Sequence, residues 1–187
     1  MLTTDPSFAP GQTRAMQRVM IVGQPGAGKS TLARLLGART GLPVYHMDHI
    51  HWKAGWVERP HDEKTAMTRA IHRKPRWIFE GGHSATYADR IAHADTYIWI
   101  DVGLGLRVWR VLKRSFVYRG RNRPDLPEGC PEQFNAGTLD FLAFIWMSRH
   151  IARAKMKALY DATPSHVTAI RLTNRRQIND FLANIEA

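Results

Sequence analysis

Eight consecutive residues at positions 23–30, Gly-Gln-Pro-Gly-Ala-Gly-Lys-Ser, have the spacing of a loop that holds phosphate groups. Glycines there allow the backbone to aim several N–H groups at one anion. Lys29 could reach the β- and γ-phosphates of a nucleotide, and the Ser30 hydroxyl could bind Mg²⁺. We predict an ATP or GTP site whose contacts are Gly23, Gln24, Pro25, Gly26, Ala27, Gly28, Lys29, Ser30 and Thr31.

The flanks of this loop favour the same interpretation over a simple glycine-rich turn. Residues 18–22 form a short apolar run that predicts a buried strand, and residues 29–40 carry leucines on one helical face. A strand, the loop and then a helix are the context in which this motif binds phosphate, because the helix N-terminus adds partial positive charge.

Two carboxylates follow other predicted strands. Asp48 comes two residues after the strand at 43–46, and Glu80 directly follows the strand at 76–79. The carboxyl ends of parallel strands share one crevice, so we expect both near the phosphate loop. Phosphoryl transfer needs a carboxylate for the metal and a group that orients the acceptor. We assign Glu80 to Mg²⁺ and Asp48 to the acceptor hydroxyl, although either could instead cap a helix or pair with an arginine.

Three histidines around Asp48 raise the alternative of a metal centre. His46, His49 and His51 fit no common zinc spacing, and alternate residues of a strand point to opposite sides. We therefore favour the acceptor role for Asp48 over a zinc site.

The segment 107–123 contains seven cationic residues and no acidic one. Arg107, Arg110 and Arg114 are spaced to share one helix face, while Trp109 and its apolar neighbours are expected to cover the core on the other side. A loop rich in glycine and proline follows. We predict an arginine-rich lid at about 114–135 that neutralises the transferring phosphoryl group. Its catalytic residues would be Arg114, Arg119, Arg121 and Arg123, and Arg110 would contact the nucleotide.

The formal charge of +11 leaves two further interpretations of this segment: a solvated basic face or a nucleic-acid patch. Concentration of the charge in one segment favours the lid. A single cysteine, Cys130, excludes an internal disulfide and indicates the cytoplasm. No apolar run approaches the length of a membrane span. Residues 1–17 lack an apolar pattern and are expected to be disordered, ahead of one domain at 18–187.

Apolar runs alternate with helical patterns, which predicts a parallel sheet in an α/β domain. The expected strands are 18–22, 43–46, 76–79, 96–100 and 166–172. The expected helices are 29–40, 62–73, 86–92, 105–118, 136–162 and 175–185.

Taken together, these motifs resemble the DNA topology modulation proteins, small P-loop proteins related to adenylate kinases. The resemblance covers nearly all of residues 18–187 and rests on the segments 23–31, 48–56, 77–84, 97–101, 109–115, 119–125 and 128–132. It implies the three-layer P-loop NTPase fold, with five parallel strands in the order 2-3-1-4-5 and an arginine-rich helical lid. It also implies an adenine site near Thr173, Asn174 and Arg175. The third-strand motif departs from the usual Asp-Gly-Asn-Tyr, because this chain has Glu80-Gly81-Gly82-His83.

These observations predict a cytoplasmic kinase that uses ATP and Mg²⁺ and transfers the γ-phosphate to a small acceptor such as a nucleoside or nucleotide. The chain would be a monomer or a homodimer. The alternative is a nucleotide-dependent regulator that binds DNA without small-molecule kinase activity. It is less favoured because the sequence contains no recognisable nucleic-acid-binding module.

Overall fold

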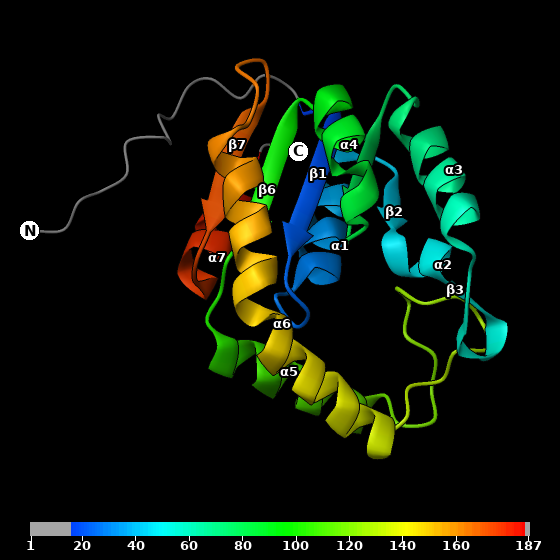
Figure 1. Cartoon of the computed structure of the whole chain (residues 1–187). Coiled ribbons are helices and arrows are strands. Elements are labelled where there is room, and N and C mark those ends of the chain that lie inside the picture. Colours follow the sequence, from blue (N-terminus) through cyan, green and yellow to red (C-terminus); the bar gives the residue numbers. More distant parts are fainter. Residues whose placement is uncertain (1–15, 186–187) are drawn as a thin grey trace, which may run out of the picture.

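The computed structural model of the chain describes residues 16–185 (Figure 1). Residues 1–15 of the segment expected to be disordered therefore lie outside the described residues. The last two residues of that segment belong to the domain instead: Met16 packs on the core, and the Gln17 carbonyl accepts a hydrogen bond from the Trp77 N–H at 2.8 Å.

A five-stranded parallel sheet forms the centre of the molecule. Its strands are β1 (Arg18–Gly23), β2 (Val44–His46), β5 (Trp77–Glu80), β6 (Thr96–Ile100) and β7 (Thr168–Leu172). They lie in the order β2-β5-β1-β6-β7, which is the predicted order 2-3-1-4-5 when these five strands are counted along the chain. The predicted α/β P-loop fold is confirmed. A small antiparallel hairpin, β3 (Trp52–Lys53) and β4 (Val57–Glu58), was not predicted.

Helices cover both faces of the sheet (Figure 1). They are α1 (Lys29–Thr40), α2 (Met47–His51), α3 (His61–His72), α4 (Tyr87–His93), α5 (Leu104–Val117), α6 (Ala136–Asp161) and α7 (Arg175–Ala183). Short 3-10 turns occur at Ala54–Trp56 and Ser84–Thr86. Apart from α2, each of these α-helices matches a predicted helix closely. None of the described helices is both long and apolar enough to cross a bilayer.

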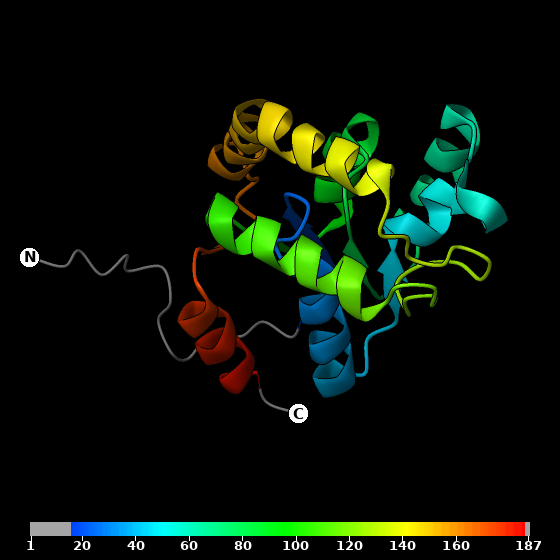
Figure 2. The ribbon, with the colours of Figure 1, turned by 90° about the horizontal axis from the view of Figure 1, so that it is seen from below.

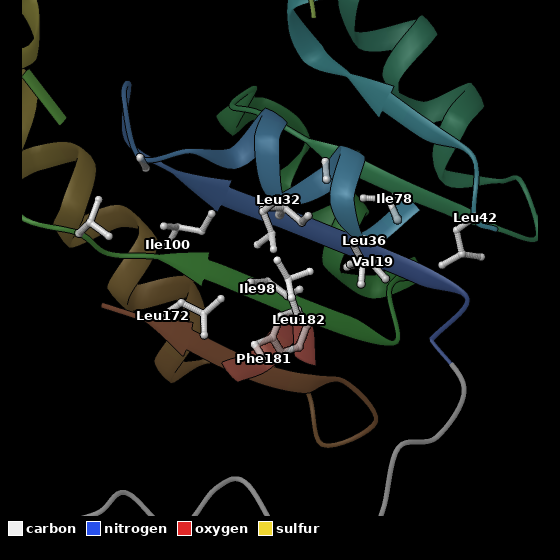
Figure 3. Close-up of a cluster of buried hydrophobic side chains, with 14 residues drawn as sticks. Val19, Leu32, Leu36, Leu42, Ile78, Ile98, Ile100, Leu172, Phe181 and Leu182 are labelled. Carbon is white, nitrogen blue, oxygen red and sulfur yellow. The ribbon is translucent and has the colours of Figure 1, made fainter. Parts of the chain in front are cut away.

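Alternation along the central strands divides the core into two layers. Val19 and Ile21 of β1 pack under α1 and α7, as Figure 3 shows for that layer. Met20 and Val22 point to the opposite face, where α2, α3, α4 and α6 contribute the packing. Because successive strand residues face opposite sides, a strand buried on both faces must be apolar throughout. Each buried strand therefore ends where its apolar run ends, and the polar site begins there.

The segment after α5 differs from the helical lid expected at 114–135. Residues 114–117 belong to α5, and residues 118–135 form an irregular loop before α6. Three prolines in this loop lack the N–H that a helix needs, and Gly120 and Gly129 have φ values of 72° and 78°. The segment predicted to be a helical lid is therefore mostly a loop, referred to below as the lid loop (residues 118–135).

Candidate active site

The phosphate loop connects the end of β1 to the start of α1, as predicted. Gly26 and Gly28 have φ values of 77° and 100°, a region that side chains rarely adopt. A Cβ atom at Gly26 would also overlap the backbone carbonyl of Arg107 in α5. Glycine is therefore required at position 26 by both conformation and space. The Lys29 ammonium lies 3.4 Å from the Gln24 carbonyl oxygen, folded back over the loop.

Helix α5 turns its arginine face toward the loop, which confirms that Arg107, Arg110 and Arg114 share one face. Arg107 is buried and donates to the Gln24 side chain, and Arg110 Nη1 donates to the Ala27 carbonyl at 2.7 Å. Burial lowers the pKa of the Arg110 guanidinium, and the charge of nearby Arg175 lowers it further. Arg175, predicted at the adenine site, thus lies near Arg110, and its contact with the nucleotide stays a prediction.

The predicted role of Trp109 in the core is wrong, because its side chain is 62% exposed. Helix α5 packs against a polar loop whose carbonyl groups need donors, so its arginines face inward. Gln24 was predicted to contact the nucleotide. Its side chain is instead buried between Arg107 and the Arg149 carbonyl, to which Nε2 donates at 2.7 Å. The Gln24 side chain therefore supports the loop and is not presented to a phosphate.

Glu80 ends β5 between β1 and β2, beside the phosphate loop. It pairs in register with Ile21 and with His46. The carboxylate is buried, and its Oε1 accepts a hydrogen bond from His46 Nδ1 at 2.7 Å. A carboxylate in this place and the partly buried Ser30 hydroxyl are the hard oxygen donors that Mg²⁺ prefers. Because Mg²⁺ usually keeps several waters and binds phosphate oxygens, these two side chains fit the ion.

Asp48 lies in the first turn of α2, which starts as soon as β2 ends. Gly81, with φ of 105°, lets β5 approach α2 so closely that a Cβ there would lie 2.5 Å from the Met47 Cβ. Burial raises the pKa of the Asp48 carboxyl, and the nearby Glu80 carboxylate raises it further, while Lys29 and Arg123 oppose the shift. The structure thus brings together the charges of Asp48, Glu80, Lys29 and Arg123.

An ion-pair cluster that the sequence analysis missed holds the lid loop beside Asp48. Glu132 Oε2 lies 3.0 Å from Arg123 Nε, and Glu132 Oε1 lies 3.5 Å from Arg114 Nε and accepts from Ser115 Oγ at 3.0 Å. Asp125 is a second partner, at 3.4 Å from Arg123 Nη1. Burial and the charge of Arg123 lower the pKa of the Arg114 guanidinium. Glu132 is the third acidic residue after the basic segment, behind Asp125 and Glu128, and nothing in the sequence singles it out as the partner.

The lid loop is also joined to the β3–β4 hairpin, so it bridges the two sides of the crevice. Three contacts make this connection: the Gly55 N–H donates to the Gly129 carbonyl at 2.8 Å, Trp56 Nε1 donates to the Pro131 carbonyl at 3.0 Å, and Cys130 Sγ donates to the Lys53 carbonyl at 3.2 Å. The hairpin follows directly from α2, which carries Asp48. The position of the lid loop is therefore tied to the element that would meet the acceptor.

The other predicted lid residues are not placed at the crevice by any contact. The side chains of Arg119 and Arg121 are exposed, and within residues 16–185 neither forms a hydrogen bond or an ion pair. Their catalytic roles remain predictions. Among the predicted site residues, the structure gathers Lys29, Ser30, Glu80, Asp48, Arg110, Arg114 and Arg123 at one edge of the sheet.

Comparison with known proteins supports a kinase. No family model matches the chain. A shikimate kinase of Chromohalobacter salexigens is 30% identical over 135 residues, which are 64% of this chain and 72% of that protein. The fold is similar to that of a shikimate kinase from Acinetobacter baumannii in complex with shikimate (TM-score 0.54, 18% identity, 91% and 90% of the two chains covered). It is also similar to a shikimate kinase from Bacteroides thetaiotaomicron (TM-score 0.52, 16% identity, 90% and 96% covered).

The two solved structures support the P-loop kinase fold alone, because their identity to this chain is low. The family is assigned from the Chromohalobacter protein, because the chain is 30% identical to it and covers 72% of its length. The chain belongs to the shikimate kinase family and is a phosphotransferase that uses ATP and Mg²⁺ to phosphorylate a small molecule.

Proposed function

We propose that the chain transfers the γ-phosphoryl group of ATP to a hydroxyl group of an acceptor bound between Asp48 and the lid loop. The observation that supports this most is the position of Asp48, whose charge is coupled to both Lys29 and Glu80. A base of raised pKa next to the phosphate-binding lysine can accept the proton that the acceptor hydroxyl releases. A hydrolase would instead need only a water molecule at the position where the acceptor hydroxyl binds.

In the proposed reaction the acceptor oxygen forms a bond to the γ-phosphorus while the bond from that phosphorus to the β-γ bridging oxygen breaks. The hydroxyl proton moves to a carboxylate oxygen of Asp48, and ADP leaves. Lys29 and the loop N–H groups hold the phosphates. Ser30 and Glu80 would hold Mg²⁺, which neutralises phosphate charge when it is bound. Arg114 and Arg123, with Arg119 and Arg121 of the lid loop, would stabilise charge on the phosphoryl group.

For the acceptor we propose a small ring compound with several hydroxyl groups, which shikimate and the nucleosides have in common. The relatives are shikimate kinases, and one of them is solved with shikimate, so shikimate is the first candidate. A carboxylate acceptor would have to compete with Glu132 and Asp125 for Arg114 and Arg123. A nucleoside carries no such charge and is the second candidate, in keeping with the resemblance to the DNA topology modulation proteins.

The test is a coupled assay for ADP with the full chain, ATP and Mg²⁺, and one acceptor at a time. Shikimate, adenosine, AMP and a neutral sugar form a panel that separates acid, nucleoside, nucleotide and plain polyol. We expect at least one acceptor to raise ADP formation about a hundredfold above the rate without acceptor. A rate that no member of the panel changes would count against the proposed transfer.

A second candidate, the regulator that binds DNA, is favoured by one observation: Arg119 and Arg121 are exposed on the lid loop without partners among the described residues. It predicts salt-dependent binding of a fluorescent DNA duplex that weakens when both arginines become alanine. DNA binding that is unchanged by this double substitution would remove the support for the regulator. We place either activity in the cytoplasm, in keeping with Cys130 as a free thiol.

A further inference from the structure

Helix α5 is amphipathic in an unusual sense, because its polar face points inward and its apolar face points outward. Arg107, Val111 and Ser115 are buried against the domain. About 180° around the helix, Leu106, Trp109, Phe116 and Val117 are exposed to solvent. A surface helix of a monomer normally shows the reverse arrangement. The outer face of α5 therefore has the composition of a face that something else covers.

Helix α6 also exposes apolar residues, although its buried side is apolar as well. Ile145 and Met156 mark its buried side. Successive helical residues are about 100° apart, so Met147 and Ile151 lie on the side facing away from the core, and Leu139 borders that side. All three are exposed, and Met147 is exposed to 76%. Phe144 and Trp146 border the same side and are also exposed.

The two helices contact each other and lie side by side at one surface of the molecule, which Figure 2 shows from below. We call this the α5–α6 face, defined by Leu106, Trp109, Phe116, Val117, Leu139, Phe144, Trp146, Met147 and Ile151. A single aromatic side chain can bury about 150–250 Å², so the four exposed aromatics alone offer on the order of 500 Å². With the aliphatic residues, the face approaches the ~800 Å² that each partner contributes to a standard protein interface.

We propose that the α5–α6 face is the interface of an isologous homodimer, in which α5 of one copy packs against α6 of the other. Two charges on this face support a second copy as the occupant. Lys113 of α5 and Asp140 of α6 are both exposed, and neither has an ion-pair partner in the described part of the chain. In the proposed dimer, a two-fold axis would bring Lys113 of each copy next to Asp140 of the other copy, so that the ion pair forms twice. An anionic membrane surface would instead repel Asp140.

Such a dimer would also support the candidate active site through α5. The inner face of α5 holds the phosphate loop through Arg107 and Arg110 and meets the lid loop through Arg114. A partner packed on the outer face would fix α5 from behind without entering the crevice. A dimer of this kind would form whichever acceptor is phosphorylated.

Sedimentation velocity of the full chain over a concentration series tests the proposal. Wild-type protein is expected to sediment with twice the chain mass of 21.3 kDa. Trp109→Glu and Met147→Glu each place two like charges in the interface, and we expect each to raise the dimer Kd at least about thirtyfold. Met67→Glu, on the exposed surface of α3, is the matched control and should leave the mass unchanged. Circular dichroism checks that all three variants remain folded.

A charge exchange identifies the partner as a second copy. Lys113→Glu alone and Asp140→Lys alone should each weaken the dimer, because each opposes like charges across the two-fold axis. The double variant should recover most of the wild-type Kd, since the pairs are restored with reversed sign. A wild-type chain that stays monomeric at about 100 µM would overturn the proposal. A dimer Kd that neither Trp109→Glu nor Met147→Glu changes would overturn it as well. So would a monomer that binds phosphatidylglycerol vesicles through Met147.

Discussion

The nucleotide side and the acceptor side of the crevice are held in place by different interactions. On the nucleotide side, side chains bind the backbone: Arg110 donates to the Ala27 carbonyl and Lys29 to the Gln24 carbonyl. On the proposed acceptor side, hydrogen bonds between the lid loop and the hairpin are joined by a buried ion-pair cluster, as in the pair of Arg123 with Glu132. A backbone scaffold depends on local spacing, whereas an ion-pair scaffold depends on residues that folding brings together. The two sides should therefore respond differently to substitution and to pH.

The largest effect is expected from Lys29→Ala on the nucleotide side. Loss of the only lysine at the phosphate loop should reduce kcat/KM for ATP at least about a thousandfold, because the ammonium binds charge that develops in the transition state. ADP formation with the best acceptor measures this. Arg34→Ala, exposed on the same helix, is the control and should retain activity. Unchanged turnover in Lys29→Ala would place the phosphate site elsewhere.

The backbone character of the nucleotide side can be tested with two glycines of similar conformation. Gly26 and Gly41 have φ values of 77° and 65°, but only at Gly26 would a Cβ meet another backbone, that of Arg107. Gly41→Ala should lower the free energy of unfolding by about 1 kcal/mol through its conformation alone. Gly26→Ala should cost about 3 kcal/mol and weaken ATP binding. Urea denaturation and calorimetry measure both, and equal costs would contradict a tight contact between the loop and α5.

The acceptor side should be the more sensitive to acid. His72 hydrogen bonds Asp89 and accepts from Arg90 Nε at 3.2 Å, and Arg90 Nη1 donates to the Gly81 carbonyl at 2.8 Å, next to Glu80. Burial lowers the pKa of His72 from 6.5 to about 4. Because the unfolded chain binds this proton more readily, stability is fully present above about pH 6.5 and falls toward pH 4, by at most ~3 kcal/mol.

Urea denaturation between about pH 7 and pH 4.5 measures that loss, and His72→Gln should flatten its pH dependence. Over the same range the acceptor KM should rise more than the ATP KM, because the Arg90 contact supports the strand end beside Asp48. A pH dependence that survives in His72→Gln would assign the loss to other groups.

The smallest effect is expected from the connection between the lid loop and the hairpin. Trp56→Phe removes the hydrogen bond to the Pro131 carbonyl but keeps an aromatic ring against Trp52. A neutral hydrogen bond contributes about 1 kcal/mol, so the acceptor KM should rise about fivefold with little change in the ATP KM. If the ATP KM rose equally, the lid loop would serve both sides alike.

The same division explains what the sequence could predict. The strands, the bounds of most helices and the Gly23–Ser30 loop follow from local periodicity and spacing, whereas the order of the sheet was implied by the family resemblance, and the structure confirms all of them. Helix α2 and the β3–β4 hairpin were missed because elements of two to five residues are too short to show a period.

Long-range pairing could not be read from the sequence at all. The partners of Arg123 depend on a turn of the lid loop that brings Glu132 back beside it. Trp109 was placed in the core because it lies on the helix face opposite the arginines, and only the packing of α5 on a polar loop shows that this face points outward.

If Asp48 receives the acceptor at a site shared with ATP, the substitution Asp48→Asn should separate acceptor-dependent turnover from ATP binding. The decisive measurement is ADP formation by wild type and variant, with and without the best acceptor, together with ATP affinity by calorimetry. We predict that acceptor-dependent turnover falls at least about a hundredfold, while ATP affinity and the rate without acceptor stay within about twofold. Acceptor-dependent turnover that persists in Asp48→Asn, or a parallel loss of ATP binding, would show that Asp48 does not act on the acceptor in the proposed way.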